Sequence, residues 1–162
     1  MTSGMSGESG VAGLGDSAAR PLTDVDFVAV PAEPERLPEL RRALAEWAER
    51  VGMSAEQVEA VTLAGYEALA NAATHAYAAG TGTLNLHAEY RSARRQVQVA
   101  VSDAGRWRTP PTDRDGLGGR GLVLIRSLAE HAEVHTDASG TTVSMHWTVP
   151  EAGRDANSPA AR

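Results

Sequence analysis

The sequence predicts an α+β fold, a two-layer sandwich in which helices pack on one face of a mixed, mostly antiparallel sheet. Three observations support this class: segments with strand and helix periodicity follow one another, short links join two pairs of strands, and 42% of the residues are hydrophobic. A chain of 162 residues suits one domain with one core. We expect that domain to span residues 21–150, between tails at 1–20 and 151–162 whose composition is typical of disorder.

The first two predicted elements are a strand and a helix. Residues 24–30 (DVDFVAV) alternate with the period of a strand, and Pro31 ends it. The side chains expected to point inward are Val25, Phe27 and Ala29. Residues 34–51 place apolar side chains at helical spacing, and Gly52 is the expected C-terminal stop.

A second helix is predicted to open at Ser54. Gln57 follows three residues later, which is the spacing of a capping box. The helix is rich in alanine, as in YEALANAATHAY at 66–77, and Gly80 is its expected end. Its small side chains favour close packing against a neighbouring element.

Residues 83–91 and 95–102 are predicted to form an antiparallel hairpin. Both segments alternate with period two, and only a short SAR link separates them. The buried face of the hairpin is expected to carry Val97, Val99 and Val101.

The remaining elements are a loop, a third helix and a second hairpin. The loop at 103–120 is polar and contains proline, and residues 121–132 (GLVLIRSLAEHA) read as a helix. The last two strands, at 134–136 and 141–149, form a hairpin around the ASG segment.

Charge and composition exclude several kinds of site. The net charge of −6 argues against sequence-independent binding of nucleic acid, because such binding needs a cationic surface. All fifteen basic residues are arginine, so a nucleotide site cannot use the lysine of a Walker motif. The absence of cysteine excludes disulfides and thiolate ligands and fits a reducing cytosol. No apolar run of roughly 18 residues and no signal-peptide pattern is present, so a cytoplasmic protein without a membrane partner is expected.

Glu67, Asn71 and His75 form a polar ridge on the second helix. Four residues advance a helix by about 400°, so each step drifts only about 40° and the three side chains lie nearly in line. One interpretation is a solvated helix face. The neighbours favour another, because they are Ala, Gly and Thr rather than Lys, Arg or Gln, and small neighbours let a backbone or a ligand approach closely.

Three further segments carry weaker signals. Asp103 ends an apolar strand just before Gly105, which indicates either a simple turn or a carboxylate at the floor of a pocket. Residues 116–122 (GLGGRGL) open the third helix and are either a flexible loop or a set of backbone donors for phosphate. A Rossmann site is excluded, because no βαβ repeat surrounds this G-x-G-x-x-G segment. Gly140 and Thr141 begin the last strand and by themselves indicate only a hairpin turn.

The four histidines outside this ridge show no metal-ligand spacing. They are His87, His131, His135 and His146. We interpret them as surface or strand residues.

Taken in order, the motifs resemble the Bergerat, or GHKL, ATP-binding fold. The family pattern is a helix with Glu-x-x-x-Asn, then Asp-x-Gly after a strand, Gly-x-Gly before a helix and Gly-Thr before the last strand. The chain carries these motifs as Glu67-x-x-x-Asn71, Asp103-x-Gly105, Gly119-x-Gly121 and Gly140-Thr141. The resemblance covers about residues 22–150.

Within that superfamily, residues 67–77 (EALANAATHAY) look like the bacterial anti-sigma-factor serine/threonine kinases, whose helix carries E-x-x-x-N-x-x-x-H-A-Y. Only fifteen residues separate Gly105 from Gly121, which fits the short lid of that branch. Many sensor histidine kinases have longer lids, and no phosphoacceptor hairpin precedes this domain, so a complete histidine kinase is not expected. By the same resemblance, His75 would brace the helix and the lid rather than touch ATP.

The resemblance implies a role for each site residue. Asn71 would ligate Mg²⁺ through its amide oxygen, and Glu67 would orient or deprotonate the attacking serine hydroxyl. Asp103 would accept a hydrogen bond from the adenine amino group, Thr141 would support that bond through water, and Gly105 would admit the base. The residues that would donate to the phosphates are Gly119, Arg120, Gly121 and Leu122.

The implied function is that of an ATP-dependent serine/threonine protein kinase and anti-sigma factor. It would bind a sigma factor, phosphorylate a small STAS-type antagonist of the anti-sigma factor and form a homodimer, without contacting nucleic acid. Some kinases of this group carry an arginine just before Gly-x-Gly, where this chain has Leu117, with Arg114 and Arg120 as candidate substitutes. This departure keeps open an alternative, a nucleotide-gated binding module with little or no catalysis. A domain that has lost ATP binding is disfavoured by the presence of Asn71 and Asp103.

Overall fold

The structure is a computed structural model that describes residues 24–75, 82–105 and 119–151. Several predicted features lie outside these ranges: the tail at 1–20, all but the first residue of the tail at 151–162, the helix end at Gly80, most of the loop at 103–120, Arg114 and Leu117. None of the described helices combines the length and the hydropathy needed to cross a membrane.

Five strands of the described ranges form one sheet in the order β1-β2-β3-β5-β4. They are β1 (Val25–Pro31), β2 (Thr83–Arg91), β3 (Gln96–Asp103), β4 (His131–Asp137) and β5 (Gly140–Thr148). Each neighbouring pair of these strands is antiparallel. The predicted α+β class is confirmed, and within the described strands the sheet is antiparallel throughout rather than mixed.

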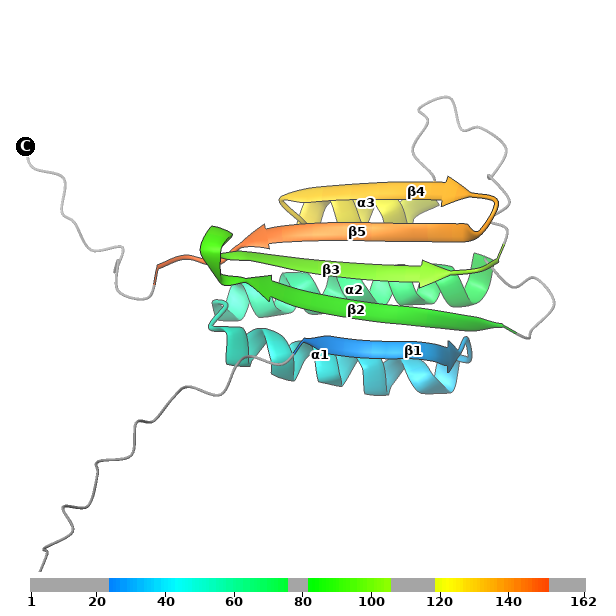
Figure 1. The fold of residues 1–162 in the computed structure, drawn as a ribbon, viewed down its shortest axis with the longest axis horizontal. Helices are drawn as coiled ribbons and strands as arrows, with labels where there is room; N and C mark the ends of the chain where they lie inside the picture. Colours follow the sequence, from blue (N-terminus) through cyan, green and yellow to red (C-terminus); the bar gives the residue numbers. More distant parts are fainter. Residues whose placement is uncertain (1–23, 76–81, 106–118, 152–162) are drawn as a thin grey trace, which may run out of the picture.

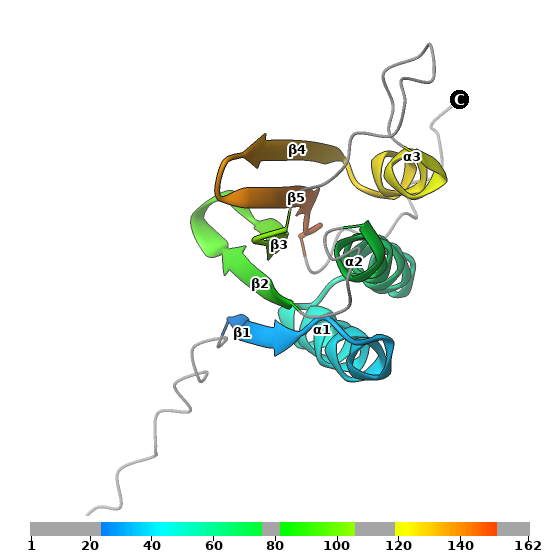
Figure 2. The same cartoon turned by 90° about the vertical axis from the view of Figure 1, so that its right-hand side faces the viewer.

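Three helices cover one face of this sheet (Figures 1 and 2). They are α1 (Leu37–Val51), α2 (Ala55–His75) and α3 (Gly119–Leu128). The first contacts β1 and β2, the second contacts β2 and β3, and the third contacts β4. A short 3₁₀ turn at Pro34–Arg36 precedes α1, and another at Ser92–Arg94 joins β2 to β3. No other described element covers the opposite face of the sheet, which Figure 2 shows as the side away from the helices.

Local side-chain chemistry sets the boundary between α1 and α2. Gly52 has a φ of 91°, in the left-handed region that favours glycine, and its N–H donates to the last turn of α1. The N–H of Ser54 donates to Oε1 of Gln57 at 3.2 Å, and the N–H of Gln57 donates to Oγ of Ser54 at 3.2 Å. The predicted stop and the predicted capping box are both confirmed.

A bulge changes the alternation of β1. Its register against β2 shifts between Phe27 and Val30, and Ala29 has a φ of 53°. The N–H of Ala29 donates to Oδ1 of Asn85 at 2.8 Å, and its side chain is exposed. The prediction that Ala29 points inward is therefore wrong, because the extra residue turns Val30 toward the core instead.

The third helix is shorter than its sequence pattern predicts. It ends at Leu128, whose carbonyl accepts a hydrogen bond of 2.9 Å from Nε1 of Trp147 on β5. The N–H of Glu130 then donates to the carbonyl of His146 at 3.2 Å, and β4 begins at His131. The prediction that this helix continues to residue 132 is therefore wrong. The chain begins to pair with β5 at a point where the sequence still has the apolar spacing of a helix.

A stripe of alanines packs α2 against the sheet. Ala64, Ala68 and Ala72 follow at four-residue spacing and are at most 1% exposed. The predicted inward side chains of β3 are also buried: Val97, Val99 and Val101. Because alanine is small, α2 lies close over β3, and the half-buried Glu67 and Asn71 lie beside the stripe.

Candidate functional site

Four segments that carry the predicted site meet at one end of the sandwich, on the right in Figure 1. They are the C-terminal half of α2, the first turn of α3, the end of β3 and the start of β5. Because β3 and β5 are antiparallel neighbours, the last residue of one strand pairs with the first residues of the other. The helix α2 contacts both β3 and α3, so it joins the two halves of the site.

The first turn of α3 packs directly on the side chain of Asn71. A Cβ atom placed on Gly121 would lie 2.7 Å from Nδ2 and 3.0 Å from Oδ1 of Asn71. The amide therefore fills the space that a side chain at position 121 would need, and the solvated-face interpretation does not hold at Asn71. The first N–H groups of a helix have no partner within it and carry partial positive charge, which favours an anion beside this amide.

Asp103 and Thr141 form a buried polar pair where β3 and β5 meet. The two residues are register partners, and they are 6% and 2% exposed. Oδ1 of Asp103 accepts a hydrogen bond of 2.9 Å from the N–H of Gly105, which fixes the turn that follows β3. Oγ1 of Thr141 lies 3.2 Å from Oγ1 of Thr136 on β4. Both side chains lie on the face of the sheet that the helices cover, since they alternate in phase with the buried side chains of β3 and β5. The hydrogen bonds of these two residues offset part of the free-energy cost of burying their polar groups.

Gly140 allows the start of β5 to approach the end of β3. Its φ is 142°, and a Cβ atom there would lie 1.9 Å from the carbonyl oxygen of Asp103 and 2.8 Å from Cα of Ala104. No other residue type fits this position. The Gly-Thr pair is visible in the sequence, but its steric reason depends on a neighbouring strand.

The other predicted site residues lie on the two helices. Glu67 is half-buried one turn before Asn71, and no hydrogen bond or ion pair joins its side chain to another described residue. In the first turn of α3, Arg120 is exposed and Leu122 is half-buried. The backbones of His75 and Gly119 are helical, and the description does not extend to the His75 side chain.

A separate open groove lies between α1 and α2. Its volume is about 410 Å³, and it is lined by Pro38, Arg41, Arg42, Ala45, Thr62 and Tyr66. The guanidinium of Arg41 lies 5.5 Å from the ring centre of Tyr66. None of the predicted site residues lines this groove, and the sequence gives no signal for it because its walls come from two helices.

The strand histidines lie away from the candidate site. The interpretation of these histidines as surface or strand residues is confirmed, since His87 is on β2, His135 is on β4 and His146 is on β5. His131, which the sequence pattern places in the third helix, is the first residue of β4. A hydrogen bond of 2.9 Å with His131 holds the pKa of Glu133 below its ordinary value. Burial lowers the pKa of His146, and the neighbouring His131 lowers it further.

Known proteins resemble this chain in sequence. The family of the histidine kinase-like ATPase domain matches residues 30–147. Serine-protein kinase RsbW of Bacillus licheniformis is 31% identical over 129 residues, which cover 71% of this chain and 80% of that protein. Serine-protein kinase RsbW of Staphylococcus aureus (strain JH9) is 30% identical over 138 residues, which cover 74% of this chain and 85% of that protein.

Solved structures share the fold at lower identity. The RsbU and RsbW domains of a Mycobacterium tuberculosis protein superpose with a TM-score of 0.65 at 20% identity, covering 83% of this chain and 35% of that one. The histidine kinase domain of a blue-light activated histidine kinase from Erythrobacter litoralis gives a TM-score of 0.53 at 22% identity, covering 74% of this chain and 61% of that one. The match of the family over most of the described domain, together with these relatives, leads to one conclusion. The chain belongs to the histidine kinase-like ATPase domain family and is related to the RsbW serine-protein kinases.

Proposed function

We propose that this chain is an ATP-binding serine/threonine protein kinase and anti-sigma factor, which sequesters a sigma factor and phosphorylates a small STAS-type antagonist. The observation that carries the proposal is the packing of the α3 N-terminus on Asn71, at the same end of the sandwich as the buried pair of Asp103 and Thr141 (Figure 1). This arrangement offers one region suited to phosphates and a cation and another suited to a base. The kinase names of the relatives support the reaction class.

In this proposal the buried carboxylate of Asp103 faces the 6-position of the purine, which makes the site selective for adenine over guanine. Adenine presents an amino group at the position where guanine presents a carbonyl oxygen, and a carboxylate accepts from the first and repels the second. A buried acceptor discriminates strongly between such bases, because a mismatch leaves polar groups unpaired. Thr141 places a hydroxyl next to this carboxylate, and Gly105 and Gly140 keep side chains out of the same region.

The phosphate region would be formed by α3 and the ridge of α2. The backbone N–H groups at positions 119–122 would donate to phosphate oxygens, and Oδ1 of Asn71 is a hard ligand suited to Mg²⁺. Bound Mg·ATP would supply the phosphoryl group and the metal charge that neutralises it. Glu67 lies one helical turn from Asn71, about 6 Å along the axis, where it would hold or accept the proton of a serine hydroxyl.

The second candidate is a nucleotide-gated binding module with weak or no catalysis. It is favoured by Leu117, the residue that stands where some kinases of this group carry arginine. Arg120 is exposed in the first turn of α3 and is available to compensate for that loss.

Transfer of label from γ-labelled ATP to the cognate antagonist separates the two candidates. The wild-type chain with Mg²⁺ should label a serine or threonine of the antagonist, and Glu67→Gln should slow this transfer about 100-fold or more while preserving ATP affinity. Glu59→Gln is the matched control, because Glu59 is an exposed glutamate two turns earlier on α2. It should transfer phosphate at the wild-type rate.

Two results would overturn parts of this assignment. Tight ATP binding by the wild-type chain without any transfer would establish the binding module. Transfer that survives Glu67→Gln unchanged would remove Glu67 from the reaction and leave the kinase assignment standing.

A further inference from the structure

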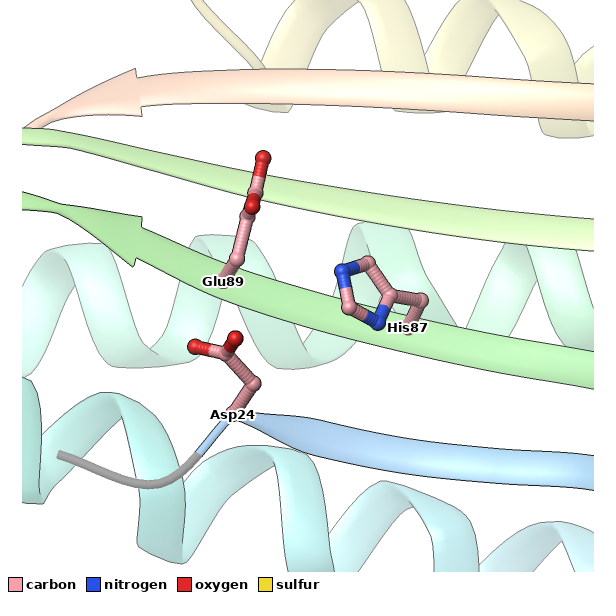
Figure 3. Close-up of side chains that lie close together, drawn as sticks. All are labelled: Asp24, His87 and Glu89. Carbon is pink, nitrogen blue, oxygen red and sulfur yellow. The ribbon is translucent and has the colours of Figure 1, made fainter.

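A cluster of metal-ligand side chains lies on the open face of the sheet, opposite the helices (Figure 3). Asp24, His87 and Glu89 each bring one ligand atom within 4.8 Å of the other two. The last two are two residues apart on β2 and so project from the same face. Val25 pairs with Ala88, which places the preceding Asp24 directly across from Glu89. The ligands come from two segments far apart in the sequence, so their linear spacing gives no metal signature.

The cluster carries an excess of negative charge. Asp24 and Glu89 face one another across neighbouring strands, an arrangement that destabilises a sheet when the charges are alike. Asp26 adds a third carboxylate, whose Oδ1 lies 3.6 Å from Nδ1 of His87. Among the described residues, Arg91 is the arginine that pairs with this cluster, and both of its contacts go to Oε1 of Glu89, one of them from Nε at 2.7 Å. Oε2 of Glu89 receives no hydrogen bond from the described part of the chain.

The imidazole of His87 is oriented as a metal ligand requires. Its Nδ1 is directed toward Asp26, and Figure 3 shows the other ring nitrogen directed toward the space between Asp24 and Glu89. Metal-binding histidines commonly have a carboxylate at the second ring nitrogen, which fixes the orientation of the ring and raises its basicity. Asp26 occupies that position here.

We propose that Asp24, His87 and Glu89 bind a divalent transition metal ion of the Zn²⁺ class. One imidazole nitrogen and two carboxylate oxygens are a ligand set that Zn²⁺ accepts, with water as a fourth ligand. Ligands of tetrahedral Zn²⁺ lie about 3.3 Å apart, so atoms already within 4.8 Å need only small side-chain movements to close on the ion. The imidazole favours this class over Mg²⁺ or Ca²⁺, which prefer oxygen ligands.

Metal binding would fasten the start of β1 to β2. β1 is an edge strand of the sheet, and its register against β2 is interrupted by the bulge after Phe27. An ion between Asp24 and the two β2 ligands would hold the N-terminal end of β1 in register. Any ion that binds the folded state better than the unfolded state also raises the melting temperature.

Calorimetric titration of the untagged, chelator-treated full chain with ZnCl₂ tests the site. The wild-type chain should bind one Zn²⁺ and show a higher Tm with excess Zn²⁺. Asp24→Asn and His87→Asn should each weaken binding at least about tenfold and lose that rise in Tm. His131→Asn is the matched control, because His131 also lies two residues from an acidic partner, Glu133, with 2.9 Å between Nε2 and Oε1, but belongs to no three-ligand group of the described residues. It should bind Zn²⁺ as the wild-type chain does.

Asp26→Asn gives a second readout that keeps all three ligands. It should weaken Zn²⁺ binding about tenfold through the orientation of His87, while circular dichroism shows the same fold. Absence of stoichiometric Zn²⁺ binding in the wild-type chain would overturn the proposal. Affinity that is unchanged in folded His87→Asn and Asp24→Asn chains would overturn it as well.

Discussion

At the scale of single residues, the contact between Gly121 and Asn71 defines the candidate phosphate region. The two residues are 50 positions apart in the sequence, yet the amide of one occupies the space of the missing side chain of the other. The absence of a side chain at position 121 therefore makes room for the amide of Asn71. A substitution of Gly121 should change the geometry of the candidate site while leaving the stability of the fold unchanged.

Gly121→Ala should weaken Mg·ATP binding without destabilising the fold. The added Cβ would lie 2.7 Å from Nδ2 of Asn71, and this amide lies at the end of a flexible side chain that can turn away. Alanine is also more favourable than glycine in a helix, by about 1 kcal/mol, so the free energy of unfolding should not fall. We expect the ATP affinity, measured by calorimetry, to fall at least about tenfold, the loss expected for removing one charge-assisted contact.

Gly65→Ala is the matched control for this experiment. Its Cβ would lie 2.5 Å from Cδ2 of Leu44, a fully buried side chain between α1 and α2. Overpacking there should lower the free energy of unfolding by about 1–3 kcal/mol and leave ATP affinity unchanged. Wild-type ATP affinity in Gly121→Ala would contradict the assigned role of Asn71.

His146 should make stability depend on pH near neutrality. Burial depresses the pKa of this imidazole, and His131, with ring centres 5.9 Å apart, acts in the same direction. Arg91 also lowers this pKa, while Glu133 and Glu89 raise it by a smaller amount. The unfolded state therefore binds a proton more readily than the folded state. The stabilisation is complete above the unfolded pKa of about 6.5, begins to be lost as the pH falls below that value, and is gone once the pH has fallen through the lower pKa of the folded state.

Urea unfolding at pH 7.5 and pH 5.5 measures this effect. The free energy of unfolding should fall at the lower pH, and His146→Gln should show a smaller fall. His135→Gln, at an exposed position on β4, should keep the wild-type difference. Equal falls in the wild-type chain and in His146→Gln would show that another group is responsible.

At the scale of secondary-structure elements, the capping box of α2 links the helix to the sheet. Ser54 and Gln57 exchange hydrogen bonds, and Nε2 of Gln57 also donates to the carbonyl of Thr148 at 2.8 Å. Ser54→Ala should lower the free energy of unfolding by about 1 kcal/mol in urea denaturation, because the N–H of Gln57 loses its partner. Ser92→Ala, in the exposed turn between β2 and β3, should change it by less than about 0.5 kcal/mol. Equal effects of the two substitutions would show that the box contributes nothing.

The elements that could be predicted from the sequence are those whose ends are set by nearby residues. Gly52 and the pair of Ser54 and Gln57 act within a few residues of the boundary that they define, so the pattern alone locates it. The end of α3 at Leu128 depends on a hydrogen bond from β5, and the bulge at Ala29 depends on Asn85 of β2. Such tertiary partners leave no signal in the local sequence pattern. For that reason the sequence predicts the wrong end for the third helix and the wrong direction for the side chain of Ala29.

The candidate site shows the same distinction. Asn71, Asp103 and Thr141 stand in short motifs whose order in the chain suggests a common site, and the fold places them at one end of the sandwich. The steric role of Gly140 could not be predicted, since it depends on the neighbouring strand. The cluster around His87 could not be predicted either, because Asp24 reaches it only through the pairing of β1 with β2.

At the scale of the whole molecule, the packing of the described helices on one side of the sheet gives the protein a covered face and an open face. The covered face carries the alanine stripe of α2 and ends in the buried pair of Asp103 and Thr141. The open face carries the histidines and their acidic neighbours. Changes on the open face should therefore leave nucleotide binding intact, which allows the two proposed sites to be tested independently.

The central claim is that Asp103 recognises adenine at the end of β3. Calorimetric titration of the wild-type chain and of Asp103→Asn with Mg·ATP and Mg·GTP tests this claim most directly. Asparagine keeps an oxygen that can accept from the N–H of Gly105, so the turn should persist and the fold should be unchanged by circular dichroism. Asp26→Asn, the same change of side chain at an exposed position of β1 on the open face, is the matched control and should bind ATP as the wild-type chain does.

We predict that the wild-type chain binds one Mg·ATP and prefers it to Mg·GTP. Asp103→Asn should bind Mg·ATP about tenfold to a hundredfold more weakly and lose most of that preference, as expected for a lost hydrogen bond to a charged group. A wild-type chain that does not bind Mg·ATP, or an Asp103→Asn chain with unchanged affinity and unchanged preference, would contradict the account.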